Sequence, residues 1–430
     1  MQLKIEKQVY GGEGLARLAA DDQGLGKSVF VPFTLAGETV EAELTEQKPG
    51  FARARLERVI EPAANRIEPG CPYFQRCGGC HYQHTTYQNQ LAIKAEVLKE
   101  TLRRTAKIEL PCELNIHASP EWNYRNRTRL KVQSEPEFAL GYYRFRSHDF
   151  LAVEQCPISS PLINQAIALM LAHGSARKLS KAVREIEFFA NATDSELLAE
   201  IYCEPRTPRA EARELAEGFI AALPMVKGVA VFQQAPESSF AEPKHLADAG
   251  AGSVAYQTKE STYRVSAGAF FQGNRFLIDE LVSVVTNGAS GQLGLDLYAG
   301  VGLFSAVLAR SFAQVIAVEA SQTCLADLQH NCGPEVKAVR ATTEKFLGQS
   351  TDLRPDFVVA DPPRSGMREN VIRSLAGLGT PRIAYVSCDP ATLARDLRNF
   401  VGLGYRIERA HLVDLFPQTF HIESVFHLTR

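Results

Sequence analysis

The chain has 430 residues, a formal net charge of −2 and 45% apolar residues, a composition typical of a globular protein of two or three domains. No apolar run reaches transmembrane length and the N-terminus does not resemble a signal peptide, so we expect no membrane association and a cytoplasmic location. The nine cysteines are odd in number and too sparse for a disulfide scaffold. A nearly neutral chain could bind a nucleic acid only through local basic patches.

Short β-like runs fill residues 1–60 and are separated by Gly- and Asp-rich turns, of which 10–16 and 20–26 are the clearest. This pattern predicts a small antiparallel β-barrel of the oligonucleotide-binding (OB) kind. The expected strands cover 3–9, 28–33, 39–44 and 52–60.

Residues 61–265 are expected to form a mixed α+β central domain. A helix is predicted over 86–105, because Leu91, Ala95, Leu98 and Leu102 recur at intervals of four, three and four. Such a stripe more often faces a core than a partner.

Residues 266–430 alternate strand and helix, which predicts a doubly wound α/β domain. A strand over 293–298 leads into a turn whose Gly300 and Gly302 would let the backbone approach a ligand at a helix N-terminus. A second strand, 314–319, ends in Glu319, where a carboxylate can bind ribose hydroxyls. Asp296, Gly300 and Gly302 form an Asp-x-x-x-Gly-x-Gly pattern. Together with the distal Glu, this pattern resembles motifs of S-adenosylmethionine-dependent methyltransferases. Near the end of the chain, 406–416 and 422–428 are expected to form an antiparallel edge pair.

Cys388 follows a short apolar strand, 382–387, and precedes Asp389 and Pro390, which are suited to the N-cap and first position of a helix. Open α/β sheets bind ligands at this carboxyl edge, and the first N–H groups of a helix favour a thiolate. A lone cysteine is more often structural, so the prediction of a reactive thiol depends on its neighbours. A third strand, 355–360, brings Asp361 to the same edge.

Residues 122–131 contain no acidic residue, and basic residues occupy every second position from 125 to 131. On a strand they would share one face and suit RNA phosphates and bases, although a solvated charged face is the alternative. The predicted RNA-binding residues are Arg125, Arg127, Arg129 and Lys131.

Five motifs follow one another along the chain: Gly268-Ala-Phe-Phe-Gln-Gly-Asn274, Asp296-Leu-Tyr-Ala-Gly-Val-Gly302, Asp361-Pro-Pro-Arg364, Ser387-Cys-Asp-Pro390 and Phe416-Pro-Gln-Thr-Phe-His-Ile-Glu423. In this order and spacing they resemble the motifs of the RNA 5-methyluridine methyltransferases. The likeness is strongest to the branch that methylates a uracil of 23S ribosomal RNA and carries an iron–sulfur cluster, and the N-terminal barrel resembles the TRAM module of that branch.

The resemblance implies a Rossmann-like C-terminal methyltransferase domain in which Cys388 is the nucleophile and Glu423 the general base. It also places Phe270 against the target base. Leu303 departs from the family, whose members often have Asn there. The implied contacts to S-adenosylmethionine are Gln272, Tyr298, Gly300, Gly302, Glu319, Thr342 and Asp361.

Cys71, Cys77, Cys80 and Cys156 have spacings suited to a four-thiolate metal site, with Gly78 and Gly79 allowing a tight turn. These ligands would also suit structural zinc. The family implies a [4Fe–4S] cluster, which four thiolates would leave without an open iron. The other cysteines, 112, 203, 324 and 332, are expected to be ordinary.

Together these features predict a monomer, with no obligate protein partner, that transfers a methyl group from S-adenosylmethionine to C5 of a uridine in 23S ribosomal RNA. Alternatives are the same chemistry on tRNA or several RNAs, a non-catalytic RNA-binding assembly factor, and an iron–sulfur electron carrier.

Overall fold

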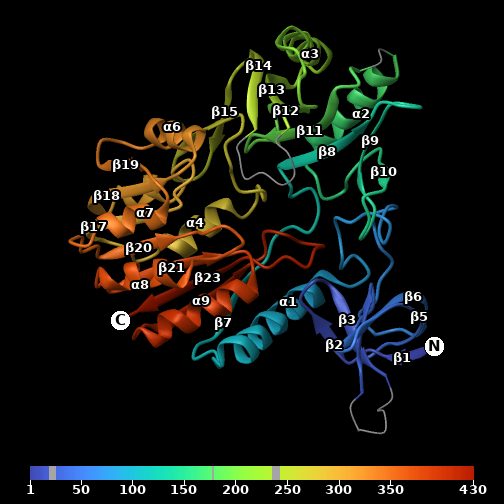
Figure 1. Ribbon diagram of the computed structural model, residues 1–430, viewed down its shortest axis with the longest axis horizontal. Helices are drawn as coiled ribbons and strands as arrows, with labels where there is room; N and C mark the ends of the chain where they lie inside the picture. The colour runs from blue at the N-terminus through green and yellow to red at the C-terminus, as the bar shows by residue number, and fades with distance from the viewer. Residues whose placement is uncertain (19–25, 177–178, 235–242) are drawn as a thin grey trace.

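A computed structural model describes residues 1–18, 26–176, 179–234 and 243–430, which form an N-terminal barrel, a central sheet and a C-terminal α/β unit (Figure 1). None of the helices in these ranges is both long and apolar enough to cross a membrane.

The N-terminal barrel is a six-stranded sheet in the order β1-β5-β6-β4-β3-β2, whose inward side chains include Val29, Val40 and Ala52. The predicted strand over 3–9 is two short strands. The turn predicted over 10–16 is shorter than expected, because Gly11 and Gly12 reverse the chain at positive φ and the next strand already begins at Glu13. Most of the 20–26 turn lies outside the described residues. The strands are β1 (Gln2–Lys4), β2 (Lys7–Val9), β3 (Glu13–Arg17), β4 (Ser28–Pro32), β5 (Thr39–Gln47) and β6 (Phe51–Glu61).

The predicted helix after the cysteine-rich segment is α1 (Tyr87–Thr101), which continues into a π-helical turn, η1 (Leu102–Ala106). Thr86 caps α1 by accepting a hydrogen bond from the Asn89 N–H. The apolar stripe is buried as expected, and it packs toward α9 (Pro390–Gly402) of the C-terminal unit.

The central part is a seven-stranded sheet in the order β10-β9-β8-β11-β12-β13-β14, and every neighbouring pair is antiparallel except β12 and β13. Its strands and helices are β8 (Arg127–Gln133), β9 (Ala139–Tyr143), β10 (Phe150–Ala152), α2 (Pro161–Ala176), β11 (Val183–Ala190), β12 (Leu197–Cys203), α3 (Arg209–Ala222), β13 (Val226–Gln233) and β14 (Lys244–Gly250). A separate hairpin, β15 (Ser253–Gln257) and β16 (Thr262–Ser266), follows it.

The C-terminal sheet has eight strands in the order β19-β18-β17-β20-β21-β23-β22-β7, the first five of them parallel. The 406–416 and 422–428 segments do pair antiparallel, but not at the edge, because β7 adds outside β22. The elements are β7 (Leu114–His117), α4 (Ile278–Thr286), β17 (Gly291–Leu297), α5 (Ser305–Leu308), β18 (Phe312–Glu319), α6 (Gln322–Asn331), β19 (Val336–Arg340), α7 (Thr343–Gln349), β20 (Phe357–Ala360), α8 (Glu369–Gly377), β21 (Arg382–Ser387), β22 (Arg406–Val413) and β23 (Ser424–Thr429).

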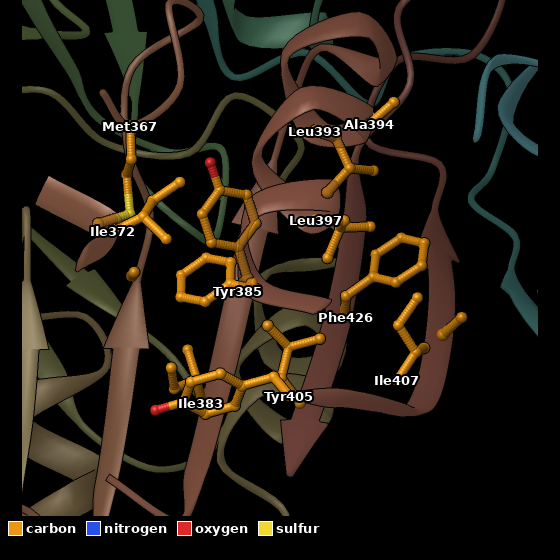
Figure 2. Close-up of a cluster of buried hydrophobic side chains, with 14 of the residues drawn as sticks. Met367, Ile372, Ile383, Tyr385, Leu393, Ala394, Leu397, Tyr405, Ile407 and Phe426 are labelled. Carbon is orange, nitrogen blue, oxygen red and sulfur yellow. The ribbon is translucent and has the colours of Figure 1, made fainter. Parts of the chain in front are cut away.

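Apolar side chains cover both faces of this sheet. On one face, Ile372 of α8 and Leu397 of α9 pack against Ile383, Tyr385 and Phe426 of the strands (Figure 2). On the other face, α4 packs with the turn after β17. The predicted doubly wound α/β architecture is confirmed, and it brings the carboxyl ends of the parallel strands to one edge.

Candidate active site

The strand register fixes the edge at which the predicted catalytic residues meet. Ser387, the last residue of β21, pairs with Ser424, the first residue of β23, and the Ser424 hydroxyl donates to the Ser387 carbonyl at 3.2 Å. Because the two strands are antiparallel, Cys388 leaves the sheet where Glu423 enters it. Asp361, one residue beyond β20, lies at the same edge.

Cys388 is held at the entrance to α9. Asp389 caps this helix, its Oδ1 accepting from the N–H groups of Ala391 and Thr392 at 3.0 and 2.9 Å, and Pro390 opens it as predicted. The surroundings of the thiol oppose the thiolate that the helix N-terminus was expected to favour. Burial, with Glu423 and Asp361 nearby, raises the pKa of Cys388 to about 12, and Arg364 opposes this only in part.

Asp361 and Glu423 bring two carboxyl groups to this edge of the sheet. Burial raises the pKa of Asp361 to about 7. Burial also raises the pKa of Glu423 well above its usual range, with Asp361 adding to the rise and Arg364 opposing it. A charge on Asp361 therefore makes ionisation of Glu423 less favourable.

The glycine turn after β17 is shaped by backbone that other residues rarely adopt. Gly302 has φ +91°, and a Cβ there would lie 2.7 Å from Leu328 Cδ1 and 2.9 Å from Cys332 Sγ. The Gly300 N–H donates to Glu319 Oε2 at 2.8 Å, so the predicted ribose-binding carboxylate is oriented by the turn itself. Gly300 also has positive φ, and the turn therefore depends on both glycines.

A small cavity joins this turn to the catalytic edge. Of the residues predicted to contact the cofactor or the base, Phe270, Gln272, Tyr298, Gly300 and Asp361 line it. The Phe270 side chain is 63% exposed, as a stacking platform for an incoming base would be.

Other predicted positions have local structural explanations. Thr342 caps α7, its Oγ1 accepting from the Lys345 N–H at 3.3 Å. Leu303 is buried in the core beneath the turn, so the departure from Asn replaces a polar side chain with packing.

Asp296 is fully buried; its Oδ2 accepts from the Ser305 hydroxyl at 2.5 Å, and its Oδ1 has no hydrogen-bond partner among the described residues. This orphaned oxygen and the two glycines of the turn, which place no side chain at 300 and 302, fit a polar cofactor lying over β17.

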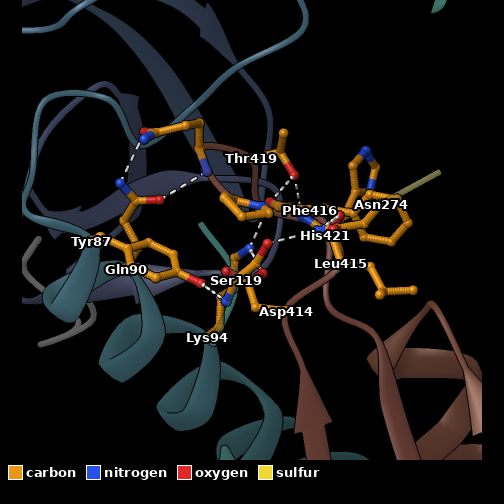
Figure 3. A network of polar contacts seen from close by, with 12 residues as sticks. Tyr87, Gln90, Lys94, Ser119, Asn274, Asp414, Leu415, Phe416, Thr419 and His421 are labelled. Atoms are coloured by element: carbon orange, nitrogen blue, oxygen red, sulfur yellow. Dashed lines mark hydrogen bonds and ion pairs between the residues drawn. The ribbon is translucent and has the colours of Figure 1, made fainter. Parts of the chain in front are cut away.

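The loop 414–423, which carries Glu423, is anchored by α1 (Figure 3). Lys94, 1% exposed, donates to Asp414 Oδ1 at 2.6 Å and to the Phe416 carbonyl at 2.9 Å. A charged pair this deeply buried orders the loop only while both partners are present. Glu423 is therefore attached to a fixed loop instead of a mobile one.

A pair of glutamines continues the same anchorage. Gln90 Nε2 donates to Gln418 Oε1 and the Gln418 N–H donates to Gln90 Oε1, both at 2.9 Å. Two further donors reach loop carbonyls: Tyr124 to Pro417 at 3.0 Å and Asn274 to Leu415 at 3.1 Å.

These anchoring residues were not among the sequence predictions, although α1 carries a signal for two of them. Lys94 is three residues after Leu91 and four before Leu98, and Gln90 is four before Lys94. Polar side chains on the apolar stripe of a helix must find buried partners. Their partners lie about 320 residues away, Asp414 being 320 residues after Lys94, and no local pattern names them.

The four predicted metal ligands face one cavity of ≈ 180 Å³ together with Arg125, and no carboxylate lines it. Burial raises the pKa of Cys77 to about 11 and the pKa values of Cys71 and Cys80 in the same direction. In the ranges that the structure describes, no three or more Cys, His, Asp or Glu side chains group closely enough to hold a single metal ion.

The basic residues of β8 alternate as predicted, with Thr128 and Leu130 buried on the opposite face. Their charges are offset by the neighbouring strand β11. Arg129 Nε donates to Glu187 at 2.7 Å, Arg127 lies 3.3 Å from Glu187, and Lys131 pairs with Glu185. Arg125 lies before β8, at the cysteine cavity. RNA contact by these four residues stays a prediction.

Comparison with known proteins gives matches over nearly the whole chain. The model of the tRNA (uracil-5-)-methyltransferase family matches residues 86–430, and the TRAM domain model matches residues 1–56. An uncharacterized RNA methyltransferase of Aquifex aeolicus is 32% identical over 431 residues, covering 99% of this chain and 97% of the relative. The 23S rRNA (uracil(1939)-C(5))-methyltransferase RlmD of Pseudomonas putida is 32% identical over 432 residues, covering 96% of this chain and 92% of the relative.

A solved structure has the same fold throughout. The tRNA (uracil-54, C5)-methyltransferase of Pyrococcus abyssi, crystallised with S-adenosyl-L-homocysteine, superposes with a TM-score of 0.78 over 100% of both chains at 21% identity.

The family match over residues 86–430, together with the doubly wound sheet and its glycine turn, defines the C-terminal unit as an S-adenosylmethionine-dependent methyltransferase domain. The chain belongs to the tRNA (uracil-5-)-methyltransferase family, whose reaction is methylation of uracil C5 in RNA, and it carries an N-terminal TRAM domain.

Proposed function

We propose that this protein methylates C5 of a uridine in 23S ribosomal RNA through a covalent bond between Cys388 and C6 of the uracil. The observation that carries the mechanism is the register of β21 and β23, which brings Cys388 and Glu423 to one edge of the sheet. Asp361, at the same edge, lines the small cavity. S-adenosylmethionine would supply an electrophilic methyl group at the turn formed by Gly300 and Gly302.

Cys388 begins the reaction. Its sulfur adds to C6, which makes C5 nucleophilic enough to accept a methyl group. The raised pKa of the thiol means that its proton must leave as the base binds, and the carboxyls of Asp361 and Glu423 are the nearby acceptors. Arg364, which favours the anionic forms of Cys388 and Glu423, is positioned to offset charge developing on the uracil ring.

Glu423 completes the reaction. After methyl transfer the C5 proton must be removed so that the C6–sulfur bond can break and the double bond return. A carboxyl whose pKa is raised is a stronger base than one free in water, and the anchored 414–423 loop holds it in place. Phe270 would stack on the uracil that has left the RNA stack.

The choice of 23S rRNA is supported by the two RlmD relatives, at 32% and 31% identity over 96% of the chain. The family model carries a tRNA name, so tRNA is the competing substrate. Unmodified 23S fragments and unmodified tRNA, offered at equal concentration with S-adenosylmethionine, would separate the two. Incorporation of the methyl group into tRNA alone would overturn the rRNA assignment.

We further propose that Cys71, Cys77, Cys80 and Cys156 hold a [4Fe–4S] cluster. The proposal is supported by the position of the four thiols around one cavity that no carboxylate lines. Protein purified without oxygen should contain about four iron and four acid-labile sulfide per chain. A content of one zinc and no labile sulfide per chain would contradict the proposal. Cys80→Ser removes one of the four thiols, and Cys112→Ser, outside the cavity, is its control.

A further inference from the structure

Two buried serine hydroxyls lie beside the backbone that carries Cys388. Ser387, 5% exposed, precedes the cysteine at the end of β21, and Ser424, 1% exposed, follows Glu423 at the start of β23. A buried hydroxyl must find its hydrogen-bond partners inside the protein. The partners of these two hydroxyls lie on either side of Cys388.

The Ser387 hydroxyl bonds to the residue on the far side of the cysteine. Its Oγ accepts from the Asp389 N–H at 3.3 Å and donates to the Asp389 carbonyl at 3.1 Å. A serine that accepts from the N–H two residues further on closes a tight turn through its side chain. Cys388 is the middle residue of this turn, so its φ and ψ, and with them the direction of its Cα–Cβ bond, are restricted by the hydroxyl.

The peptide bond before Cys388 is held from the neighbouring strand. The Ser424 hydroxyl donates to the Ser387 carbonyl at 3.2 Å, and this carbonyl belongs to the peptide that joins Ser387 to Cys388. Ser424 is also the residue next to Glu423. The two hydroxyls therefore form a chain of hydrogen bonds from the residue beside Glu423 to the residue after Cys388.

The strands and the helix around Cys388 are formed by other groups. Backbone pairing joins β21 to β23, and the Asp389 side chain caps α9. The Asp389 carbonyl already accepts from the Leu393 N–H at 3.0 Å, which begins the helix. What the Ser387 hydroxyl adds is a restraint on the single residue between strand and helix, Cys388.

We propose that Ser387 is a positioning residue for Cys388, and that Ser424 extends this restraint to the strand that follows Glu423. The two hydroxyls keep the sulfur aligned with C6 of the uracil, and a misplacement of about 1 Å in such a geometry can cost about 100-fold in rate. This inference rests on the proposed function, because it concerns the attack of Cys388 on uracil.

The test measures adduct formation between the full-length protein and 5-fluorouridine-containing 23S RNA, in a single turnover at saturating S-adenosylmethionine. Fluorine at C5 leaves no proton for the base to remove, so the adduct persists and its rate constant reports sulfur attack and methyl transfer. Ser387→Ala removes the hydroxyl, and Ser387→Thr keeps it. Ser180→Ala is the matched control, since the Ser180 hydroxyl, before β11 of the central sheet, accepts from the Ala182 N–H at 3.1 Å in the same pattern.

Ser387→Ala should lower the rate constant at saturating RNA about tenfold, while the half-saturating RNA concentration stays within about twofold of the wild-type value. Ser387→Thr and Ser180→Ala should keep the rate constant within about threefold of the wild type. A purely structural role would instead reduce the fraction of folded protein, which lowers the amount of adduct but not its rate constant.

An unchanged rate constant in Ser387→Ala, equal losses in Ser387→Ala and Ser387→Thr, or a loss of RNA affinity alone would each overturn the positioning role. If Ser387→Ala does not fold, Ser424→Ala decides, because it removes only the bond to the Ser387 carbonyl: a rate constant lowered about threefold supports the role, and an unchanged one overturns it. A wild-type protein that formed no adduct would refute the proposed function itself, so the two failures are distinguishable.

Discussion

Ser387 pairs with Ser424 across β21 and β23, so that Cys388 and Glu423 are the residues immediately beyond one strand pair. A nucleophile and a base separated by 35 residues in sequence thus reach one edge through two regular strands. The register also explains why the base depends on the loop before it. Substitutions that leave the strands intact but loosen the 414–423 loop should impair the later step of the reaction more than the first.

Glu423→Gln should trap the methylated intermediate on ordinary uridine RNA. Cys388 can still add to C6, but the C5 proton has no acceptor, so the covalent complex should persist at least about 100-fold longer than in the wild type. A denaturing gel with methyl-labelled S-adenosylmethionine would show label in the protein–RNA band. Glu408→Gln, on the exposed side of β22, is the control; rapid release of methylated RNA by Glu423→Gln would exclude this role.

Lys94→Met should lower the free energy of unfolding by about 3–5 kcal/mol, because it leaves Asp414 buried without its cation. The double variant Lys94→Met/Asp414→Leu should recover part of this loss, since no charge is then buried. Urea denaturation measures both. Lys99→Met, on the exposed side of α1, should change stability by less than about 0.5 kcal/mol. Equal losses in the single and double variants would contradict the buried-pair account.

Asp296→Asn should become more stabilising, relative to the wild type, as the pH rises. Burial raises the pKa of Asp296 to about 7, so between about pH 4 and 7 the folded state holds a proton that the unfolded chain has released. The protonated Asp296 carboxyl therefore contributes to the free energy of unfolding of the wild type at low pH. This contribution is lost as the pH rises toward 7, at up to about 1.4 kcal/mol per pH unit. Urea midpoints of both proteins at several pH values give the difference, and a difference independent of pH would contradict it.

Gly302→Ala should destabilise the fold by about 2 kcal/mol and weaken S-adenosylhomocysteine binding, because the new Cβ meets Leu328 and the backbone has positive φ. Gly377→Ala is the matched control: its Cβ would meet no atom within 4 Å and its φ is not positive. Titration calorimetry measures the affinity. Unchanged binding by Gly302→Ala would show that the turn does not shape the cofactor site.

The sequence contained enough to place the sheet and most of the catalytic edge. Strand periodicity located β17, β20 and β21, and the Asp389-Pro390 cap was correct because capping depends on adjacent residues. The protonation state of Cys388 could not be predicted in the same way. The helix N-terminus was visible in the sequence, but the opposing burial and carboxyl groups arise only when β23 folds beside β21.

Long-range partners were the other limit. Alternation correctly placed Arg129 and Lys131 on one face of β8. Glu185 and Glu187, which offset their charges, belong to β11, a strand that begins 50 residues after β8 ends. The ring contact between Tyr10 and Phe420 joins the turn after β2 to the loop before β23. Such pairings follow from how domains dock, which no local pattern specifies.

The most direct measurement of the central claim is mass spectrometry of the protein after incubation with S-adenosylmethionine and 5-fluorouridine-containing 23S RNA. The account predicts one nucleotide-modified peptide, the one containing Cys388, and no adduct with Cys388→Ala. An adduct at another cysteine such as Cys324, or full methyl transfer by Cys388→Ala, would contradict it.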